Sequence, residues 1–369
     1  MTADDALEKQ LQDAGLYDPS RPDAAERLEA FRYLLGNGVT VDEVRGVYRE
    51  DSLELAAVDR LIKGGKERLT LAEAAERANV SRDLALRLWL ADGFPDPGDA
   101  PIFTEDDWHF PLFALAAEKL GEDTTLQVTR VIGSAMARIA EAEVAAFAQN
   151  VAEPMLDDRL ALMKTSVELM SALPGIATVM DRIHRHHLES AIRRLIFATE
   201  GFTGTVDRAP MAIGFADLTG YTALSQRLTH EELARALASF EAAAHNEVVE
   251  RGGRVVKLIG DEVMFAATHV HEACDIALAL AGRVSANPSL PDLRTGIAFG
   301  GVLVRDGDYY GPVVNLASRA AAVAAPGQTL VTADVAREDG SVHRFESVGK
   351  HALKGFDEEI ELLELSTKP

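Results

Sequence analysis

Apolar residues repeat with different spacing in the two halves of this 369-residue chain. In residues 4–64 and 110–199 they recur every three or four positions, as at Leu28, Phe31 and Leu34, which is the spacing of one helix face. After residue 205, short apolar runs alternate with helical stretches, a pattern typical of a sheet covered by helices. The pattern predicts an α+β protein, with an all-α domain at residues 1–180, a helical linker at 181–205 and a mixed α/β domain at 206–369.

Residues 69–107 have the outline of a helix-turn-helix, with a turn at residues 78–80 and a second helix that begins after Ser81. Arg82 and Arg87 are the basic residues of this second helix. Residues 1–200 as a whole carry 22 basic and 36 acidic side chains, a net charge of −14, and the chain has a net charge of −22. Because non-specific affinity for nucleic acid depends on clustered Lys and Arg, we expect the helix pair to serve packing and expect no nucleic-acid partner.

Residues 110–170 are rich in alanine and apolar on more than one helical face. Helices of this kind are buried against one another or across a subunit interface. Met155, Met163 and Met170 fall in the second half of this stretch, and flexible methionine side chains can line an apolar cavity. We favour core packing here and keep a lipid or fatty-acid ligand of the N-terminal domain as the alternative.

Residues 181–199 predict one continuous helix that leads into the second half of the chain. His184, His186 and His187 are three of the ten histidines, and they lie beside Arg182 and Arg185. A histidine ordinarily changes charge near pH 6.5, so these three residues are a candidate pH switch, with a solvated basic face as the alternative. The apolar residues of the same helix form a seam suited to pairing with a second helix: Ile183, Leu188, Ala191, Ile192 and Leu195.

Cys274 is the only cysteine, which excludes an internal disulfide and suits a reducing cytoplasm. It falls in an apolar helical stretch, and we expect it to be a small core residue. The N-terminus is acidic and lacks the pattern of a signal peptide, and no window of about 18 uncharged apolar residues predicts a membrane span. These observations predict a cytoplasmic protein without membrane spans.

Two aspartates lie at the ends of predicted strands in residues 206–369. The strand at residues 211–217 ends on Asp217, and a Gly turn then leads into a helix whose first N–H groups can face an anion. Residues 255–265 predict a hairpin with Asp261 at its tip, beside Gly260. Such carboxylates are available to a cation, although Gly-Asp also occurs in hairpins for conformational reasons alone.

The helix that we expect after Pro312 places Asn315 and Arg319 four residues apart, on one face. An amide and a guanidinium on one face suit a ribose and a phosphate, although Arg319 could instead pair with a surface acid. Further strands are predicted at residues 293–299, with a turn at 300–301, and at 329–332, followed by a closing hairpin at 343–365.

Three segments together resemble the signature segments of the class III nucleotidyl cyclases, in the order and spacing of that family: FADLTGYT at 215–222, KLIGDEVMF at 257–265 and DYYGPVVNLASR at 308–319. The first 200 residues resemble, more loosely, the autoinhibitory N-terminal domain of the pH-responsive mycobacterial members. The resemblance implies a ferredoxin-like catalytic domain that follows an all-α regulatory domain.

The resemblance also implies a role for each matching residue. Asp217 and Asp261 match the ligands of two divalent cations, Mg²⁺ or Mn²⁺. Lys257 and Asp308 match the pair that reads the adenine edge, where guanylyl cyclases usually carry Glu and Cys or Ser, so the resemblance favours ATP.

The remaining matches concern the ribose and the phosphates. Asn315 matches the residue that positions the ribose, and Arg319 matches the residue that steadies charge on the reacting phosphate. Lys354 matches the lysine that binds the triphosphate, with Lys350 as a substitute.

The activity that the resemblance implies is that of an adenylyl cyclase, which converts ATP to 3',5'-cyclic AMP and pyrophosphate. The family forms its sites at a homodimer interface, with the aspartates from one subunit and the purine, ribose and phosphate residues from the other. The N-terminal domain is then expected to inhibit the catalytic domain. The alternative is a non-catalytic nucleotide-sensing or DNA-binding regulator with a cyclase-like domain; such sensors usually lack a metal-binding Asp or the Arg, and this chain has both.

Overall fold

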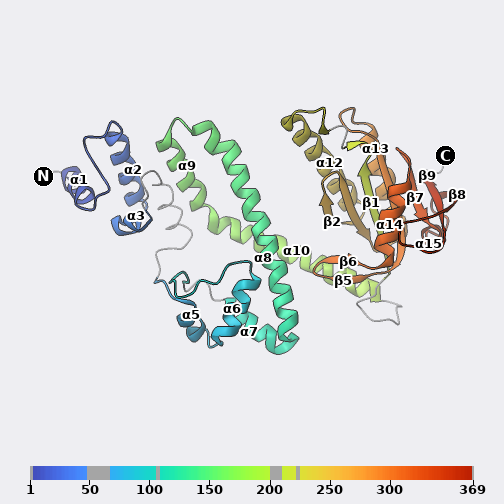
Figure 1. Ribbon diagram of the computed structural model, residues 1–369, viewed down its shortest axis with the longest axis horizontal. Helices are drawn as coiled ribbons and strands as arrows, with labels where there is room; N and C mark the ends of the chain where they lie inside the picture. The colour runs from blue at the N-terminus through green and yellow to red at the C-terminus, as the bar shows by residue number, and fades with distance from the viewer. Residues whose placement is uncertain (1–2, 48–66, 105–108, 200–209, 222–224, 368–369) are drawn as a thin grey trace. The chain divides into compact units, whose positions relative to one another are not determined.

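A computed structural model describes residues 3–47, 67–104, 109–199, 210–221 and 225–367 (Figure 1). The chain forms two compact units, Met1–Arg185 and His186–Pro369. The boundary falls inside one helix, α10 (Leu173–Thr199).

Helices are the regular structure of the N-terminal unit in its described residues, apart from one isolated β-bridge between Leu69 and Phe103. The prediction of an all-α N-terminal region is therefore confirmed. A π-helical turn (Ala148–Ala152) and a 3-10 turn (Glu153–Met155) lead from α8 to α9. Besides α10, its α-helices are α1 (Ala3–Asp13), α2 (Ala24–Gly36), α3 (Val41–Val47), α5 (Leu71–Arg77), α6 (Arg82–Ala91), α7 (His109–Leu120), α8 (Glu122–Phe147) and α9 (Arg159–Ser171).

Two separate apolar clusters hold this unit together. In the first, Phe31 of α2 packs with residues of α1, α3 and α9, and Met163 of α9 is buried there. In the second, Leu88 of α6 packs with residues of α5, α7 and α8. The side chain of Met163 thus fills a core, but Leu112, Leu115 and Met136 of the same stretch are exposed, so the packing interpretation holds only for part of it.

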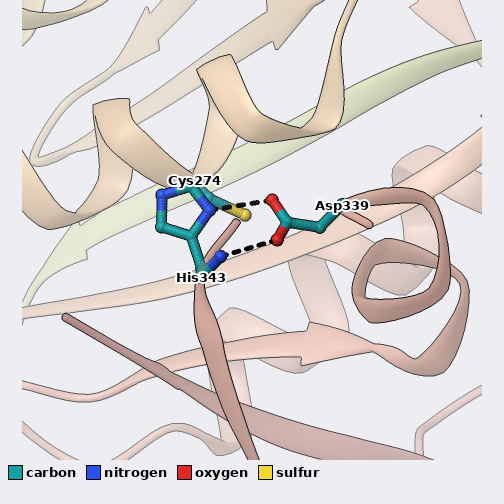
Figure 2. Close-up of side chains that lie close together, drawn as sticks. All are labelled: Cys274, Asp339 and His343. Atoms are coloured by element: carbon teal, nitrogen blue, oxygen red, sulfur yellow. Dashed lines mark hydrogen bonds and ion pairs between the residues drawn. The ribbon is translucent and has the colours of Figure 1, made fainter. Parts of the chain in front are cut away.

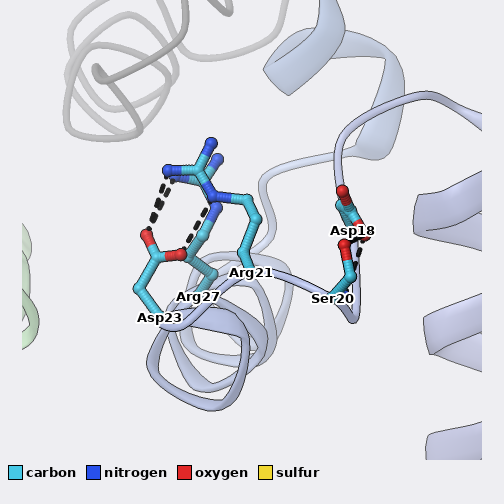
Figure 3. A network of polar contacts seen from close by, with 5 residues as sticks. All are labelled: Asp18, Ser20, Arg21, Asp23 and Arg27. Carbon is cyan, nitrogen blue, oxygen red and sulfur yellow. Dashed lines mark hydrogen bonds and ion pairs between the residues drawn. The ribbon is translucent and has the colours of Figure 1, made fainter.

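The connection between α1 and α2 is fixed by polar contacts (Figure 3). Ser20 donates its backbone N–H and its hydroxyl to Asp18, at 2.9 and 2.7 Å. Arg21 donates to Asp23 at 2.9 Å, and the buried Arg27 lies 3.8 Å from the same carboxylate. The hydrogen bonds from Ser20 lower the pKa of Asp18, and those from Arg21 lower the pKa of Asp23. These contacts order the turn that precedes the first buried face of α2.

Helix α10 begins earlier than the helix that we predicted at residues 181–199. It starts at Leu173, with Pro174 in the first turn, where the missing N–H of proline costs no hydrogen bond. The side chains of Ile183, Leu188, Ala191 and Ile192 are exposed. The apolar seam predicted for this helix therefore has no cover within the described chain.

The C-terminal unit is built on a seven-stranded sheet of order β2-β3-β1-β4-β7-β9-β8, with β4 and β7 parallel and the other neighbours antiparallel. The first six elements run β1-α12-β2-β3-α13-β4, which is the ferredoxin-like order. The predicted fold class is confirmed. The elements are β1 (Pro210–Leu218), α12 (His230–Glu250), β2 (Arg254–Ile259), β3 (Glu262–Ala267), α13 (Val270–Ser285), β4 (Leu293–Gly301), β5 (Leu303–Arg305), β6 (Asp308–Tyr310), α14 (Pro312–Val323), β7 (Thr329–Thr332), α15 (Ala333–Glu338), β8 (Arg344–His351) and β9 (Ile360–Ser366).

Both faces of this sheet are covered by helices. Alternate residues of a strand point to opposite faces, so the packing of β1 shows which helices cover each face. Ala212 and Ala216 of β1 pack in the cluster that contains α12 and α13. Ile213 and Phe215, which alternate with them, pack against α14. The sheet therefore carries the helices α12 and α13 on one side and α14 on the other (Figure 1).

Gly296 of β4 sets how closely α14 approaches the sheet. A Cβ at this position would lie 2.2 Å from the carbonyl oxygen of Ala317 and 2.2 Å from the backbone nitrogen of Ala321, both in α14. Only glycine leaves room for the helix backbone there. Because α14 also carries Asn315 and Arg319, this contact positions two of the candidate site residues.

None of the helices in the described ranges has the length and apolar character required to cross a membrane.

Candidate functional site

Asp217 and Asp261 meet at one edge of the C-terminal sheet. Asp217 lies near the end of β1, and Asp261 lies in the turn between β2 and β3. Gly260 has φ +64°, in the left-handed region that favours glycine, and so permits the tight turn. The backbone N–H of Leu218 donates to the carbonyl oxygen of Asp261 at 3.2 Å, which ties the hairpin tip to the end of β1.

The neighbours of Asp217 come from the strands on either side of β1. In the sheet register Asp217 lies opposite Glu262 of β3 and opposite Arg294 of β4. Arg294 Nε donates to Asp217 Oδ2 at 2.8 Å, and its Nη2 donates to the same oxygen. The Asp217 side chain is only 15% exposed, so its charge is largely removed from water and is met by this arginine.

Burial, and after it the nearby carboxylates, raises the pKa of two of these acids. Burial, together with the charge of Asp217, raises the pKa of Asp261. Burial and the charges of Asp217 and Asp261 likewise raise the pKa of Glu262. Three carboxyl groups lie beside one guanidinium, so acidic groups outnumber basic groups at this edge of the sheet. Carboxylate oxygens are the ligands that Mg²⁺ and Mn²⁺ prefer. The residues present therefore fit a divalent cation.

Lys257 and Asp308 form a second polar group. Lys257 of β2 donates from Nζ to Asp308 Oδ2 at 2.5 Å, and the backbone N–H of Tyr309 donates to Asp308 Oδ1 at 2.7 Å. Both side chains remain accessible, at 40% for Lys257 and 22% for Asp308. The pair thus presents a cationic donor and an anionic acceptor side by side at the surface.

Asn315, Arg319 and Lys354 line one pocket of about 280 Å³. Asn315 and Arg319 project from α14, and Lys354 comes from the turn between β8 and β9; Pro312, Gly355 and Phe356 complete the lining. An amide, a guanidinium and an ammonium around one hollow form a site for a polar anion. Lys350, the substitute for Lys354, is exposed on β8 opposite Glu361 and does not line the pocket.

The predicted site residues thus fall into three groups. In the described residues, hydrogen bonds and ion pairs join Asp217 to Arg294 and Lys257 to Asp308, and none joins one pair to the other. The lining of the 280 Å³ pocket includes neither aspartate. The cation-binding acids and the anion-binding pocket are separate features of a single chain.

The three histidines of α10 are all exposed. Arg185 donates to Asp181 at 2.8 Å, and Arg193 donates to Glu189 at 2.7 Å, so acids and arginines alternate around the histidines. This face of α10 is solvated and of mixed charge.

Two further features of the N-terminal unit bear on its ligands. Arg87 of α6 pairs with Asp83 and with Glu122 of α8, so one of the two arginines of the helix-turn-helix outline is held by acids. An apolar pocket of about 670 Å³ lies among α6, α7 and α8, with Phe94, Met136 and Arg130 in its lining. Neither Met155 nor Met163 lines it.

Sequence reasoning missed Arg294, Glu262 and Phe356. Arg294 and Glu262 become neighbours of Asp217 only through the strand order, which no local pattern reveals. The sequence offers one signal for Phe356, because this aromatic residue lies two positions after Lys354, the lysine expected to bind the triphosphate.

Two family descriptions match the chain. Residues 206–365 match the family described as adenylate and guanylate cyclase catalytic domain, and residues 8–192 match the family described as adenylate cyclase regulatory domain. The predicted resemblance to class III cyclases and to their regulatory domain is confirmed.

Three relatives show how far the similarity extends. An adenylate cyclase of Streptomyces coelicolor is 39% identical over 78% of this chain and 76% of its own. A pH-sensitive adenylate cyclase of Mycobacterium tuberculosis is 30% identical over 85% of this chain and 80% of its own. An uncharacterized protein of Mycobacterium tuberculosis is 36% identical over 97% of this chain and 94% of its own. The similarity therefore covers both units.

Proposed function

Because the chain belongs to the family of adenylate and guanylate cyclases and carries the regulatory domain of the adenylate cyclases, we propose that it converts ATP to 3',5'-cyclic AMP and pyrophosphate. The observation that most favours ATP as the substrate is the 2.5 Å contact between Lys257 and Asp308. The edge of adenine offers a ring nitrogen that accepts a hydrogen bond and an amino group that donates one. An ammonium and a carboxylate placed side by side complement this edge, because Lys only donates and ionised Asp only accepts.

Asp217 and Asp261 hold two divalent cations, Mg²⁺ or Mn²⁺, in this proposal. When bound, the cations activate the 3'-oxygen of the ribose and neutralise the leaving phosphates. The geometry supports this role, because Asp217, Asp261 and Glu262 lie together at one edge of the sheet, and burial and the neighbouring Asp217 raise the pKa of Asp261. Arg294 then serves to balance the charge of Asp217 when no cation is bound.

The pocket on α14 holds the ribose and the phosphates. Asn315 orients the ribose, and Arg319 offsets the negative charge that develops on the α-phosphate as the new bond forms. Lys354 binds the triphosphate from the β8–β9 turn. Most of the rate enhancement then comes from positioning and from electrostatic stabilisation, and no side chain of the site is assigned as a general base.

Two copies of the chain form the active sites. The pocket of Asn315, Arg319 and Lys354 has no carboxylate in its lining, so one chain supplies no cation ligand to its own pocket. Large exposed apolar side chains flank the Lys257–Asp308 pair on both contributing hairpins, as expected of an interface. They are Leu258 and Ile259 beside Lys257, and Leu303, Val304 and Tyr310 beside Asp308.

The N-terminal unit regulates these sites through the linker at residues 181–205. On α10, Ile183 is exposed, and residues three and four positions later, His186 and His187, fall on the same face of the helix. If this face pairs with a second α10, protonation at acidic pH places like charges in the seam and weakens the pairing. Acidification then relieves the inhibition. The pH-sensitive relative supports this assignment.

A lipid or fatty acid is the ligand that fits the pocket of about 670 Å³ in the N-terminal unit. Its lining is mostly apolar, and Arg130 offers a cation to a carboxylate head group. Titration of the purified protein with oleate, followed by tryptophan fluorescence, tests this binding. No saturable change in fluorescence at any oleate concentration below its micelle threshold would rule it out.

The activity itself is tested by incubating the purified full-length protein with ATP and Mn²⁺ or Mg²⁺ and measuring cyclic AMP. We expect Asp217→Ala and Arg319→Ala each to lower the rate at least about 100-fold, since each removes several kcal/mol of transition-state stabilisation. Asp334→Asn is the matched control, because Asp334 is also an aspartate paired with an arginine, Arg337, but lies on α15 outside all three groups.

Mixing the two inactive variants tests the shared site. In a mixed dimer, Asp217→Ala and Arg319→Ala fall in the same site and leave the other site intact, so an equal mixture should recover about a quarter of the wild-type activity. No cyclic AMP from the wild-type protein would instead favour a non-catalytic nucleotide sensor. Wild-type activity without recovery in the mixture would contradict the shared site alone.

A further inference from the structure

Three side chains with metal-ligating atoms lie together on the face of the sheet that carries α12 and α13. Cys274 belongs to α13, Asp339 ends α15, and His343 lies just before β8 (Figure 2). Their ligand atoms, one sulfur, one carboxylate oxygen and one imidazole nitrogen, all lie within 4.8 Å of one another. This cluster shares no residue with the three groups of the candidate active site.

The orientation of Asp339 and His343 is fixed by hydrogen bonds. The backbone N–H of His343 donates to Asp339 Oδ2 at 2.8 Å, which leaves Oδ1 facing Nδ1 of the His343 ring, also at 2.8 Å. On the other side of the ring, Nε2 lies 3.1 Å from Oδ1 of Asp275. A histidine that binds a metal through one ring nitrogen usually donates the other N–H to a carboxylate, which is the role that Asp275 fits.

The cluster is closed to solvent. Cys274 is fully buried, the Asp339 side chain is 0% exposed and the His343 side chain is 8% exposed, whereas Asp275 is 53% exposed and marks the side open to solvent. Burial, followed by the charges of Asp339 and Asp275, raises the pKa of the Cys274 thiol. The thiol is therefore neutral at ordinary pH and is not a reactive nucleophile.

Thiolate, imidazole and carboxylate are the three ligand types that bind Zn²⁺ in proteins. Ligand atoms at Zn–S of about 2.3 Å and Zn–N or Zn–O of about 2.0–2.2 Å lie roughly 3.3–3.8 Å apart around a tetrahedral ion. The cluster, whose ligand atoms lie within 4.8 Å of one another, reaches that geometry by side-chain shifts on the order of 1 Å. We propose that Cys274, Asp339 and His343 bind one Zn²⁺ ion through Sγ, Oδ1 and Nδ1, with a water molecule as the fourth ligand.

Binding of the ion exchanges protons for metal. Cys274 loses its thiol proton, and the proton between Nδ1 of His343 and Oδ1 of Asp339 is displaced; both protons pass to solvent as the Zn–S and Zn–N bonds form. With Nδ1 bound to the ion, Nε2 of His343 is left to donate its N–H to Asp275. The two positive charges of the ion offset those of its two anionic ligands, the thiolate and Asp339.

The proposed zinc links helix α13 to the segment between α15 and β8. That segment leads directly into the β8–β9 hairpin, whose turn carries Lys354 of the pocket on α14. The ion therefore fixes the start of the hairpin to a helix on the sheet and supplies stability, while the divalent cations at Asp217 and Asp261 belong to the chemistry. This inference does not depend on the proposed activity.

Cobalt(II) is the probe that tests the site, because a thiolate bound to Co²⁺ gives an intense charge-transfer band in the near ultraviolet. Cys274 is the only cysteine of the chain, so this band can arise from no other thiol, and oxygen ligands such as Asp217 do not produce it. Titration of chelator-treated, full-length protein with Co²⁺ should give a band that saturates at one equivalent per chain. Added Zn²⁺ should then bleach it.

Two variants and one control define the ligands. Cys274→Ser should abolish the band while the circular dichroism of the protein is retained. Asp275→Asn should keep the band but weaken Co²⁺ binding about 10- to 100-fold, as expected for a residue that orients a ligand. The control Asp334→Asn should change neither the band nor the affinity.

The wild-type titration decides the proposal even if Cys274→Ser fails to fold. A protein that shows no thiolate band up to a large excess of Co²⁺, or that retains the band in Cys274→Ser, does not bind zinc through this cluster. A band in the wild-type protein whose intensity and affinity are the same in His343→Gln would remove His343 from the ligand set and overturn the site as stated.

Discussion

The two units of the chain bury their apolar residues in different ways. The main sheet of the C-terminal unit has a buried cluster on each face, and exposed apolar side chains lie on two hairpins of this unit, at Leu258 and Ile259 and at Leu303 and Val304. The N-terminal unit has two smaller clusters, and its long helices leave apolar rows uncovered. These rows are Val128, Ile132, Met136 and Ile139 on α8, and Ile176, Val179 and Ile183 on α10.

This difference indicates a division of labour. The C-terminal unit is complete as a fold, and it holds the polar groups suited to cations, purine and phosphate. The N-terminal unit holds no comparable set in its described residues, but it presents apolar helix faces that a second copy of the chain can cover. Substitutions in the C-terminal unit should therefore alter the catalytic rate, and substitutions in α10 should alter only the regulation of that rate.

The largest change is expected from Lys257 and Asp308, the pair that we propose reads the purine. Replacing Lys257 by Glu and Asp308 by Cys exchanges the donor and acceptor pattern for the one usual in guanylyl cyclases. The rate with ATP should fall at least about 10-fold for each hydrogen bond lost, because a site built to pair with a polar edge rejects a ligand that leaves its groups unpaired. Cyclic AMP and cyclic GMP are measured in parallel with ATP and GTP.

The shape of the pH profile is the control for this variant. It should remain that of the wild-type protein, since α10 is unchanged. A double variant that keeps its full rate with ATP would contradict the assignment of Lys257 and Asp308.

A smaller change is expected from the histidines of α10. Replacing His184, His186 and His187 by Gln removes the groups that charge at acidic pH. Like charges on a helix cost a few tenths of a kcal/mol per pair, and a dimer contains several such pairs. We therefore expect the activity of the wild-type protein to rise three- to tenfold from about pH 8 to 5.5, and the activity of the variant to stay nearly constant.

The matched control replaces three exposed histidines of the C-terminal unit, His230, His245 and His271, by Gln. It should keep the wild-type profile. If the α10 variant keeps that profile as well, pH sensing lies elsewhere in the chain.

The smallest change in rate is expected from the contact between β4 and α14. Gly296→Ala inserts a methyl group 2.2 Å from the backbone of α14, so the helix must shift, at a cost of about 1–3 kcal/mol of unfolding free energy. The variant should show a lower Tm and a higher KM for ATP, because Asn315 and Arg319 move with the helix.

Gly282→Ala is the matched control for this prediction. Gly282 lies within α13, and no atom lies within 4 Å of its added methyl group, so alanine should stabilise the helix by roughly 0.5–1 kcal/mol. Equal effects of the two substitutions on Tm would show that the approach of α14 does not depend on Gly296.

Local patterns predicted individual elements of the C-terminal unit well. At the start of α12, Thr229 and Glu232 make the reciprocal hydrogen bonds of a capping box, which depends on residues only three positions apart. The strand expected at Thr329–Thr332 has the observed bounds. Caps and side-chain periodicity are properties of neighbouring residues, so they can be read without knowledge of the fold.

Local patterns were wrong where pairing with a distant strand decides the backbone. The strand predicted at residues 293–299, with a turn at Gly300 and Gly301, continues through both glycines, because they pair with Met211 and Pro210 of β1. Glycine favours a turn on its own, but the hydrogen bonds of an antiparallel pair outweigh that preference.

The sequence by itself determined the fold class, the hairpin with Asp261 at its tip and, by resemblance, the identity of seven residues expected to bind cations and nucleotide. Only the tertiary structure decided that Arg294 meets Asp217, that Lys354 joins Asn315 and Arg319 around one pocket, and that Cys274, Asp339 and His343 converge in the core. The reason is physical. Periodicity and turn residues act over a few positions, whereas these contacts depend on strand order and on the packing of helices onto the sheet, which bring together residues far apart along the chain.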